Sequence, residues 1–186
     1  MTTSDFRKGL AIKYNNETYV LVNYQFVNPG KGSAFTRAKM KNVKTLKVVE
    51  VTFKSGESIE EANMEYRKCQ YLYTDGTEYY FMDNNSYEQF SMSKEIIGEQ
   101  SEYLMDGGEL TVVFIDERAV GIQLPPKMDF KVTEAPPGEK GDTATGGTKL
   151  VTIETGAKVA APLFIKEGDR IRVNTDTGEY VERVSN

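Results

Sequence analysis

The 186-residue chain contains no histidine and a single cysteine, Cys69. Without imidazole it can build neither a Ser-His nor a Cys-His catalytic pair, and no histidine metal site. One cysteine forms no intramolecular disulfide and no thiolate zinc site, which fits a reducing cytoplasm. Cys69 lies in the strand-like run YRKCQYLY and is expected to be a small buried hydrophobe. An enzyme built on carboxylates or lysine stays open, but no spacing indicates one. We predict a protein that is not an enzyme and has no metal or cofactor.

Long apolar runs are also lacking. No run approaches the ~20 residues that cross a bilayer, and the N-terminus MTTSDFRKGL has no apolar segment typical of a secretory signal. We therefore expect no membrane partner and a cytoplasmic location. A hydrophobic content of 39% and a charged content of 27% are ordinary for a soluble globular protein. The length is sufficient for two or three small domains.

Acidic residues are absent between residues 18 and 49, whereas six basic residues fall there. Residues 1–54 carry ten Lys and Arg against three Asp and Glu, a net charge of +7, and the remaining residues carry 13 against 25, a net charge of −12. A polyanion would be attracted to the first part and repelled by the rest. A solvated basic face without a ligand is the alternative. The six basic residues are Lys31, Arg37, Lys39, Lys41, Lys44 and Lys47.

Strand signals dominate the chain and predict an all-β protein of small antiparallel barrels. Two breaks, the acidic stretch at 54–65 and LPPKMD at 124–129, indicate three domains, which we place at 1–63, 64–126 and 127–186. Only 92–97 and 98–104 are helical candidates. The predicted strands are 19–27, 34–43, 46–53, 69–75, 77–83, 109–116, 120–125, 130–135, 149–154 and 169–175.

The turn NPGKGSAF, residues 28–35, joins the first two predicted strands and places one lysine between two glycines. Gly30 and Gly32 can adopt positive φ and carry no side chain, so the loop could approach another backbone with only Lys31 projecting. The P-loop pattern does not fit, because one residue separates the glycines and no helix follows. A plain hairpin turn with an incidental lysine is the main alternative.

The strand after this turn alternates basic and apolar residues. Arg37, Lys39 and Lys41 alternate with Ala38 and Met40. A period of two places the three cations on one face of the strand and the apolar pair on the other. Such a cationic strip is suited to following a phosphate backbone along its length.

Several segments together resemble bacterial elongation factor P, over essentially the whole chain. They are DFRKGLAI followed by YVLV, NPGKGSAFTRAKMKN, TFKSGE, YLYTDGTEYYFMD, PGEKGDTATGG, TGAKVAAPLFIKEGDRIRV and NTDTGEYVERV. A lone PGKG would be weak support. All of these blocks, in this order and in a chain of this length, make the resemblance to that family specific.

The resemblance implies an L-shaped arrangement of an SH3-like, KOW-type barrel and two OB-folds. It implies binding to the ribosome beside peptidyl-tRNA and stimulation of peptide-bond formation at consecutive prolines. The tip lysine, here Lys31, would reach the CCA end of the peptidyl-tRNA. In many members of the family an enzyme first lengthens this lysine, so a lysine-modifying enzyme is a further expected partner. We expect the protein to be a monomer. Pro29, Gly30, Gly32 and Ser33 would shape the tip. Gly141, Asp142 and Thr143 would lie near the exit-site codon.

The chain departs from the family pattern at four positions. Asn174 and Asp176 stand where Asp and Arg are frequent, and the second change reverses a charge. Pro136 replaces a common Asp and Leu150 a frequent proline. A general RNA-binding β-barrel protein, acting away from the peptidyl-transferase centre, is the alternative function. It predicts that scattered basic residues matter and that Lys31 has no special role.

Overall fold

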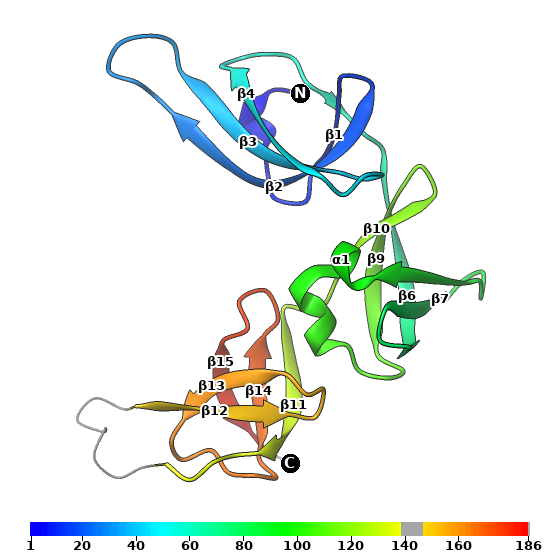
Figure 1. Ribbon diagram of the computed structural model, residues 1–186, viewed down its shortest axis with the longest axis vertical. Coiled ribbons are helices and arrows are strands. Elements are labelled where there is room, and N and C mark those ends of the chain that lie inside the picture. The colour runs from blue at the N-terminus through cyan, green and yellow to red at the C-terminus, as the bar shows by residue number, and fades with distance from the viewer. Residues whose placement is uncertain (139–146, 186) are drawn as a thin grey trace. The chain divides into compact units, whose positions relative to one another are not determined.

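A computed structural model describes residues 1–138 and 147–185 and is nearly all β (Figure 1). Its strands form three five-stranded sheets, which confirms the predicted fold class. By its internal contacts the chain divides into two compact units. Unit 1 comprises Met1–Arg67 and Val112–Gly121, and unit 2 comprises Lys68–Thr111 and Ile122–Asn186. The domain boundaries expected at residues 63 and 126 stay a prediction.

The first sheet lies in unit 1 and has the order β4-β3-β2-β1-β5. Asn15 and Asn16 join β1 to β2 with φ of +50° and +63°, the left-handed conformation that a tight type I′ hairpin requires. One face of the sheet packs on a core that includes Leu10, Ile12 and Met40. The strands are β1 (Ala11–Tyr14), β2 (Glu17–Val27), β3 (Phe35–Asn42), β4 (Val48–Lys54) and β5 (Glu60–Glu61).

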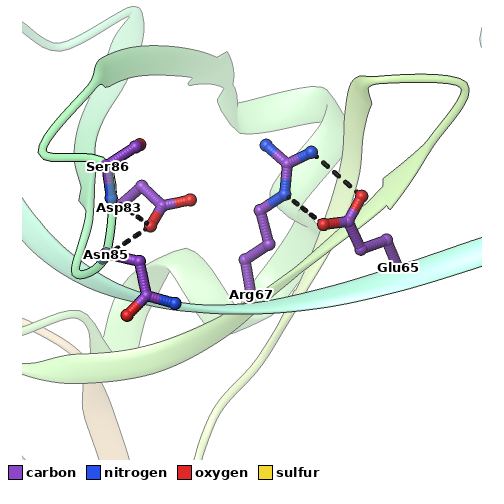
Figure 2. Close-up of polar contacts among 5 residues, drawn as sticks. All are labelled: Glu65, Arg67, Asp83, Asn85 and Ser86. Atoms are coloured by element: carbon purple, nitrogen blue, oxygen red, sulfur yellow. Dashed lines mark hydrogen bonds and ion pairs between the residues drawn. The ribbon is translucent and has the colours of Figure 1, made fainter.

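The second sheet has the order β10-β9-β6-β7-β8. In unit 1, the Arg67 guanidinium makes a bidentate contact with Glu65, at 2.9 and 3.0 Å (Figure 2). It also lies 4.1 Å from the centre of the Phe114 ring. The Glu65 contact lies within β6 and orients the guanidinium, and the Phe114 contact joins the start of β6 to β9. The strands are β6 (Met64–Thr74), β7 (Glu78–Asp83), β8 (Gln89–Ser93), β9 (Glu109–Ile115) and β10 (Arg118–Gln123).

Side-chain hydrogen bonds shape the turn between β7 and β8 and the start of the helix that follows β8. In unit 2, Asp83 Oδ1 accepts hydrogen bonds from the backbone N–H groups of Asn85 and Ser86, which shapes the β7–β8 turn (Figure 2). Ser93 caps the short helix α1 (Lys94–Ile97) by accepting from the Ile96 N–H. The 3₁₀ helix η2 (Gly98–Tyr103) follows. Both predicted helical segments are therefore confirmed.

The third sheet lies in unit 2 and has the order β13-β12-β11-β14-β15. Its buried face contains Phe130, Val132, Ile153 and Ile171, each 0% exposed. Asp129 on β11, Arg172 on β14 and Glu182 on β15 are paired in register and form ion pairs of 2.8 Å. The strands are β11 (Lys127–Glu134), β12 (Thr148–Ile153), β13 (Lys158–Pro162), β14 (Arg170–Asn174) and β15 (Tyr180–Val184).

Five of these strands, β1, β5, β8, β13 and β15, are missing from the strands predicted in the sequence. Each is short, with at most five residues, and is held in place by pairing with a neighbouring strand. Among the described residues, no helix is long and apolar enough to cross a membrane.

Candidate RNA-binding tip and basic strand

Lys31 lies in the loop at the end of the β2–β3 hairpin (Figure 1). Val27 and Phe35 form the last pair of the ladder before this loop. Gly30, Lys31, Gly32 and Ser33 are exposed, and Pro29 is half-buried. Gly32 has a φ of +108°, whereas Gly30 does not have a positive φ, so of the two glycines only Gly32 uses the left-handed freedom that both possess.

The side chain of Lys31 has no intramolecular partner in the part of the chain that the structure describes. It forms no hydrogen bond and no ion pair with residues 1–138 or 147–185. The Gly neighbours offer no side chain to cover it, and a Cβ at Gly30 would meet nothing within 4 Å. The ammonium is therefore presented to solvent and available to an external anion or acceptor.

The three cations of β3 lie on the face opposite the core. Arg37 and Lys39 are exposed and Lys41 is half-buried, whereas Ala38 and Met40 are 0% exposed. This alternation follows from the strand's period of two and from the packing of one face on the core of unit 1. The strip of positive charge thus starts at Arg37, two residues after the beginning of β3, and runs along β3 away from the loop that contains Lys31.

Two amide side chains extend this face onto β2. Asn23 pairs with Lys39, and Gln25 pairs with Arg37, across the β2–β3 ladder. These two pairs line a hollow of ≈ 260 Å³, and its other lining residues are Tyr24 and Glu50. Amides can donate to phosphate and accept from sugar hydroxyls, as well as contacting bases. Sequence reasoning missed Asn23 and Gln25. Their spacing of two within VNYQFV would have placed them on one face of the strand.

Glu50 is the one acid on this face of unit 1's sheet among the residues that line the hollow, and it pairs with Lys39 in the β3–β4 register. It reduces the positive field midway along the strip. Towards the tip, the Arg37 guanidinium lies 5.4 Å from the centre of the Phe35 ring, which holds it near the loop. Lys31 and Arg37 therefore both lie on the tip side of the position where Glu50 pairs with Lys39.

Aromatic contacts fix the base of the hairpin. Phe6 packs edge-on against Tyr24, with ring centres 6.0 Å apart, and against Phe53 at 5.6 Å. The β2–β3 register shifts between Leu21 and Asn23, and beyond this bulge the β2 side chains are exposed, Phe26 by 60%. A bulge bends a strand and increases its twist. The outer half of the hairpin is thus an arm that is exposed along β2 and still packed along β3, where Thr36 and Ala38 are 1% and 0% exposed.

The remaining candidate residues from the sequence are Gly141, Asp142 and Thr143, together with the departures Asn174 and Asp176. Gly141, Asp142 and Thr143 lie outside the described residues. In unit 2, Asn174 Oδ1 accepts from the backbone N–H of Asp176 at 2.9 Å, and Asp176 Oδ1 accepts from Gln100 Nε2 at 3.2 Å. Both departures from the family pattern therefore have local structural partners in this protein.

Unit 1 contains a second hollow, which the three cations of β3 do not line. A hollow of ≈ 900 Å³ in unit 1 is lined by Lys13, Glu60 and Arg118 among others, and Lys13 and Glu60 form an ion pair of 3.5 Å across exposed side chains. Within residues 1–138 and 147–185, no group of three or more His, Cys, Asp or Glu side chains could hold a metal ion.

Three family models match successive parts of the chain. A model described as an elongation factor P KOW-like domain matches residues 2–59. A model for the elongation factor P OB domain matches residues 64–122, and one for the elongation factor P C-terminal region matches residues 128–183.

Full-length relatives show the same similarity. The protein named elongation factor P from Moorella thermoacetica is 48% identical over 183 residues, which are 98% of this chain and 99% of that protein. Its namesake from Syntrophomonas wolfei is 47% identical over 184 residues, 99% of this chain and 100% of that one. Among solved structures, translation initiation factor 5A from Methanococcus jannaschii is 24% identical, with a TM-score of 0.46, and covers 66% of this chain and 90% of its own.

Proposed function

The chain belongs to the elongation factor P family of translation factors, and from this premise we propose that it binds the ribosome beside peptidyl-tRNA and stimulates peptide-bond formation at consecutive prolines. Lys31 reaches the CCA end of that tRNA. The observation that carries the proposal is the exposed, unpartnered Lys31 ammonium at the end of the β2–β3 arm.

The proposed role of the basic strand is to hold the arm on RNA. Arg37, Lys39 and Lys41 would follow a phosphate backbone, and the Asn23 and Gln25 amides would add hydrogen bonds beside it. Such contacts carry no sequence information by themselves. They suit a factor that must act on many tRNAs.

The proposed mechanism is positioning. Proline is a poor nucleophile for steric and conformational reasons, so the step gains from a donor tRNA that is held in register with the incoming amine. Lys31 supplies contacts to the CCA backbone as a charged hydrogen-bond donor and transfers no proton. The chemistry stays with the ribosome, and this protein is not an enzyme.

Reconstituted translation of a message with three consecutive proline codons tests this function. We expect protein from its native host to relieve the stall and Lys31→Ala to lose that effect. Lys47→Ala is the matched control, because Lys47 is an exposed lysine beyond the opposite end of β3. Equal relief by wild type and Lys31→Ala would refute the role of the tip.

A modification of Lys31 is a separate part of the proposal. An exposed lysine flanked by glycines leaves room for an enzyme to lengthen the side chain. The mass of the tryptic peptide that contains residue 31, from native protein, tests this directly. Lys31→Arg keeps the charge but blocks amine chemistry, so full activity of that variant would show that charge alone is sufficient.

A general RNA-binding protein is the second candidate, and the net charge of +7 in residues 1–54 favours it. It predicts that Lys31→Ala, Lys39→Ala and Lys41→Ala weaken RNA binding equally. It also predicts no relief of the proline stall by the wild-type protein. The same translation assay therefore separates the two candidates.

A further inference from the structure

A β-bulge in the second sheet, within unit 2, turns one tyrosine outward. The β6–β7 register shifts between Tyr71 and Tyr73, so that Tyr71 pairs with Phe81 and Tyr73 pairs with Tyr80. Without the bulge, Tyr71 and Tyr73 would share a face. With it, Tyr71 is 4% exposed in the core and Tyr73 is 53% exposed on the other side.

Tyr73 and Tyr80 form a stacked pair on the outer face of neighbouring strands. Their ring centres are 4.6 Å apart and their planes differ by 18°. Stacking immobilises both rings without burying them, and rigid tyrosines with an exposed face are typical of recognition surfaces. The pair lies outside the core, because the next residue of β7, Phe81, points to the opposite face and is the one that fills the core, at 0% exposed.

An ionised carboxylate lies at the edge of the stack. Asp75 Oδ1 accepts hydrogen bonds from the Glu78 and Thr77 N–H groups and the Thr77 hydroxyl, and Oδ2 accepts from the Tyr80 hydroxyl at 3.1 Å. The backbone bond from Glu78, first among these, lowers the pKa of Asp75 to about 2. Oδ2 accepts only this bond from the described residues, so it can accept another.

The surrounding charge identifies the kind of partner. Residues 64–126 contain four basic and twelve acidic residues, a net charge of −8. By the alternation of β7, Glu78 lies on the same face as Tyr80 and adds a further negative charge there. A nucleic acid would be repelled here, whereas a basic segment of a protein would be attracted.

We propose that Tyr73, Tyr80 and Asp75 form a docking surface for an arginine of a basic protein segment. A guanidinium can lie flat on the exposed Tyr73 ring and donate to Asp75 Oδ2 at the same time, because it is planar and carries five donors. The ammonium of lysine offers a point charge and no plane, so it would use the carboxylate alone. This surface goes beyond the proposed function and does not involve Lys31.

Titration of the ¹⁵N-labelled full chain tests the surface. The probes are a capped tetra-arginine peptide, a capped tetra-lysine peptide and an octauridylate. We expect the arginine peptide to shift the amides of residues 74–80 and to bind about fivefold more tightly than the lysine peptide, and we expect Tyr73→Ala and Asp75→Asn each to weaken it about fivefold. Asn keeps an oxygen for the turn, so Asp75→Asn should preserve the loop.

Two further variants make the result interpretable. Tyr87→Ala removes a 71% exposed tyrosine outside the stack and should leave arginine binding unchanged. Tyr80→Phe keeps the ring and frees Oδ2, so it should bind at least as well as wild type. Equal affinity for arginine and lysine, an equal loss in Tyr87→Ala, or shifts of residues 74–80 by octauridylate would each overturn the proposal, the last in favour of an RNA surface.

Discussion

The two glycines beside Lys31 differ in backbone conformation, so they should differ in tolerance to alanine. Gly32 has a φ of +108°, where an L side chain is strained, and Gly30 has open space and no positive φ. We expect Gly32→Ala to cost about 1 kcal/mol locally and to displace the tip. Relief of the proline stall should fall in Gly32→Ala, whereas Gly30→Ala should behave as wild type in the same assay.

The thermal midpoint of both variants separates tip geometry from folding. The loop is exposed, so neither substitution should unfold unit 1. If Gly30→Ala impairs activity as much as Gly32→Ala, the requirement is for a bare backbone that approaches RNA closely, and strain is not the cause.

Asp129 predicts an acid-sensitive contribution to stability. The hydrogen bonds from Arg172 Nε and Nη2, at 2.8 and 3.2 Å, hold the pKa of Asp129 below its usual value of 3.8. The folded state then binds fewer protons than the unfolded one, so the contribution is full above pH 3.8 and is lost as the pH falls through the lower folded pKa. Asp129→Asn should lower the melting temperature at pH 7, and its difference from wild type should shrink towards pH 2.

Glu167→Gln provides the control for this pH series. Glu167 is exposed and has no hydrogen bond or ion pair with the described residues. Its melting temperature should stay close to wild type at both ends of the series. A constant difference between Asp129→Asn and wild type down to pH 2 would contradict the ionic role of the pair.

Single residues of the site differ in how far the sequence reveals them. Lys31 is conspicuous because glycines and a proline surround it in a turn. The contribution of Asn23 and Gln25 depends on cross-strand register, which a bulge between Leu21 and Asn23 alters. Composition does not indicate where a bulge falls, so these amides could be identified only from the paired strands.

Strand β3 should separate stability from RNA binding, since its two faces have different roles. Met40 is 0% exposed in the core of unit 1, so Met40→Ala should lower the free energy of unfolding by about 3 kcal/mol. Lys39 is exposed, and Lys39→Ala should change it by less than about 0.5 kcal/mol. Urea denaturation and tRNA binding, measured on both variants, check the division.

We expect Met40→Ala to change stability without changing tRNA binding, and Lys39→Ala to do the opposite. Below its unfolding transition, Met40→Ala should bind tRNA as wild type does, and Lys39→Ala should bind it more weakly. Loss of RNA binding in folded Met40→Ala would mean that the strand's curvature, rather than its charge, makes the surface.

Two of the strands that the sequence did not predict have a composition that does not favour strands. β13 reads KVAAP, in which alanine and proline have low strand propensity, and β5 has only two residues, both glutamate. Their backbone bonds to β12 and β1 hold them extended. By contrast, β2 and β9 carry enough β-branched and aromatic residues to be predicted from composition alone, and β3 is recognised by its alternation of basic and apolar residues.

The division of charge over the chain is fully visible in the sequence and falls at the end of the fourth strand of the first sheet, before the short acidic strand β5. The part with a net charge of +7 ends at residue 54, the last residue of β4 in the first sheet. Everything from residue 55 onwards has a net charge of −12. Neither pairing nor packing changes these charges, which is why this property could be predicted and strand register could not.

The charge division predicts how binding to a deacylated tRNA depends on salt. If Lys31, Arg37, Lys39 and Lys41 each contact a phosphate, the logarithm of the affinity should fall with the logarithm of salt concentration with a slope of about −3 to −4. Lys39→Ala should make the slope shallower by about 0.7 to 0.9. Fluorescence anisotropy between low and physiological salt measures both.

Lys166→Ala is the matched control, because Lys166 is an exposed lysine in the acidic part of the chain. Its slope should equal that of wild type, since a polyanion that is repelled from residues 55–186 does not contact it. A change in slope for Lys166→Ala as large as that for Lys39→Ala would mean that phosphates lie along both parts of the chain. The basic strand would then have no special role, and the general RNA-binding alternative would be favoured over a factor that works through its tip.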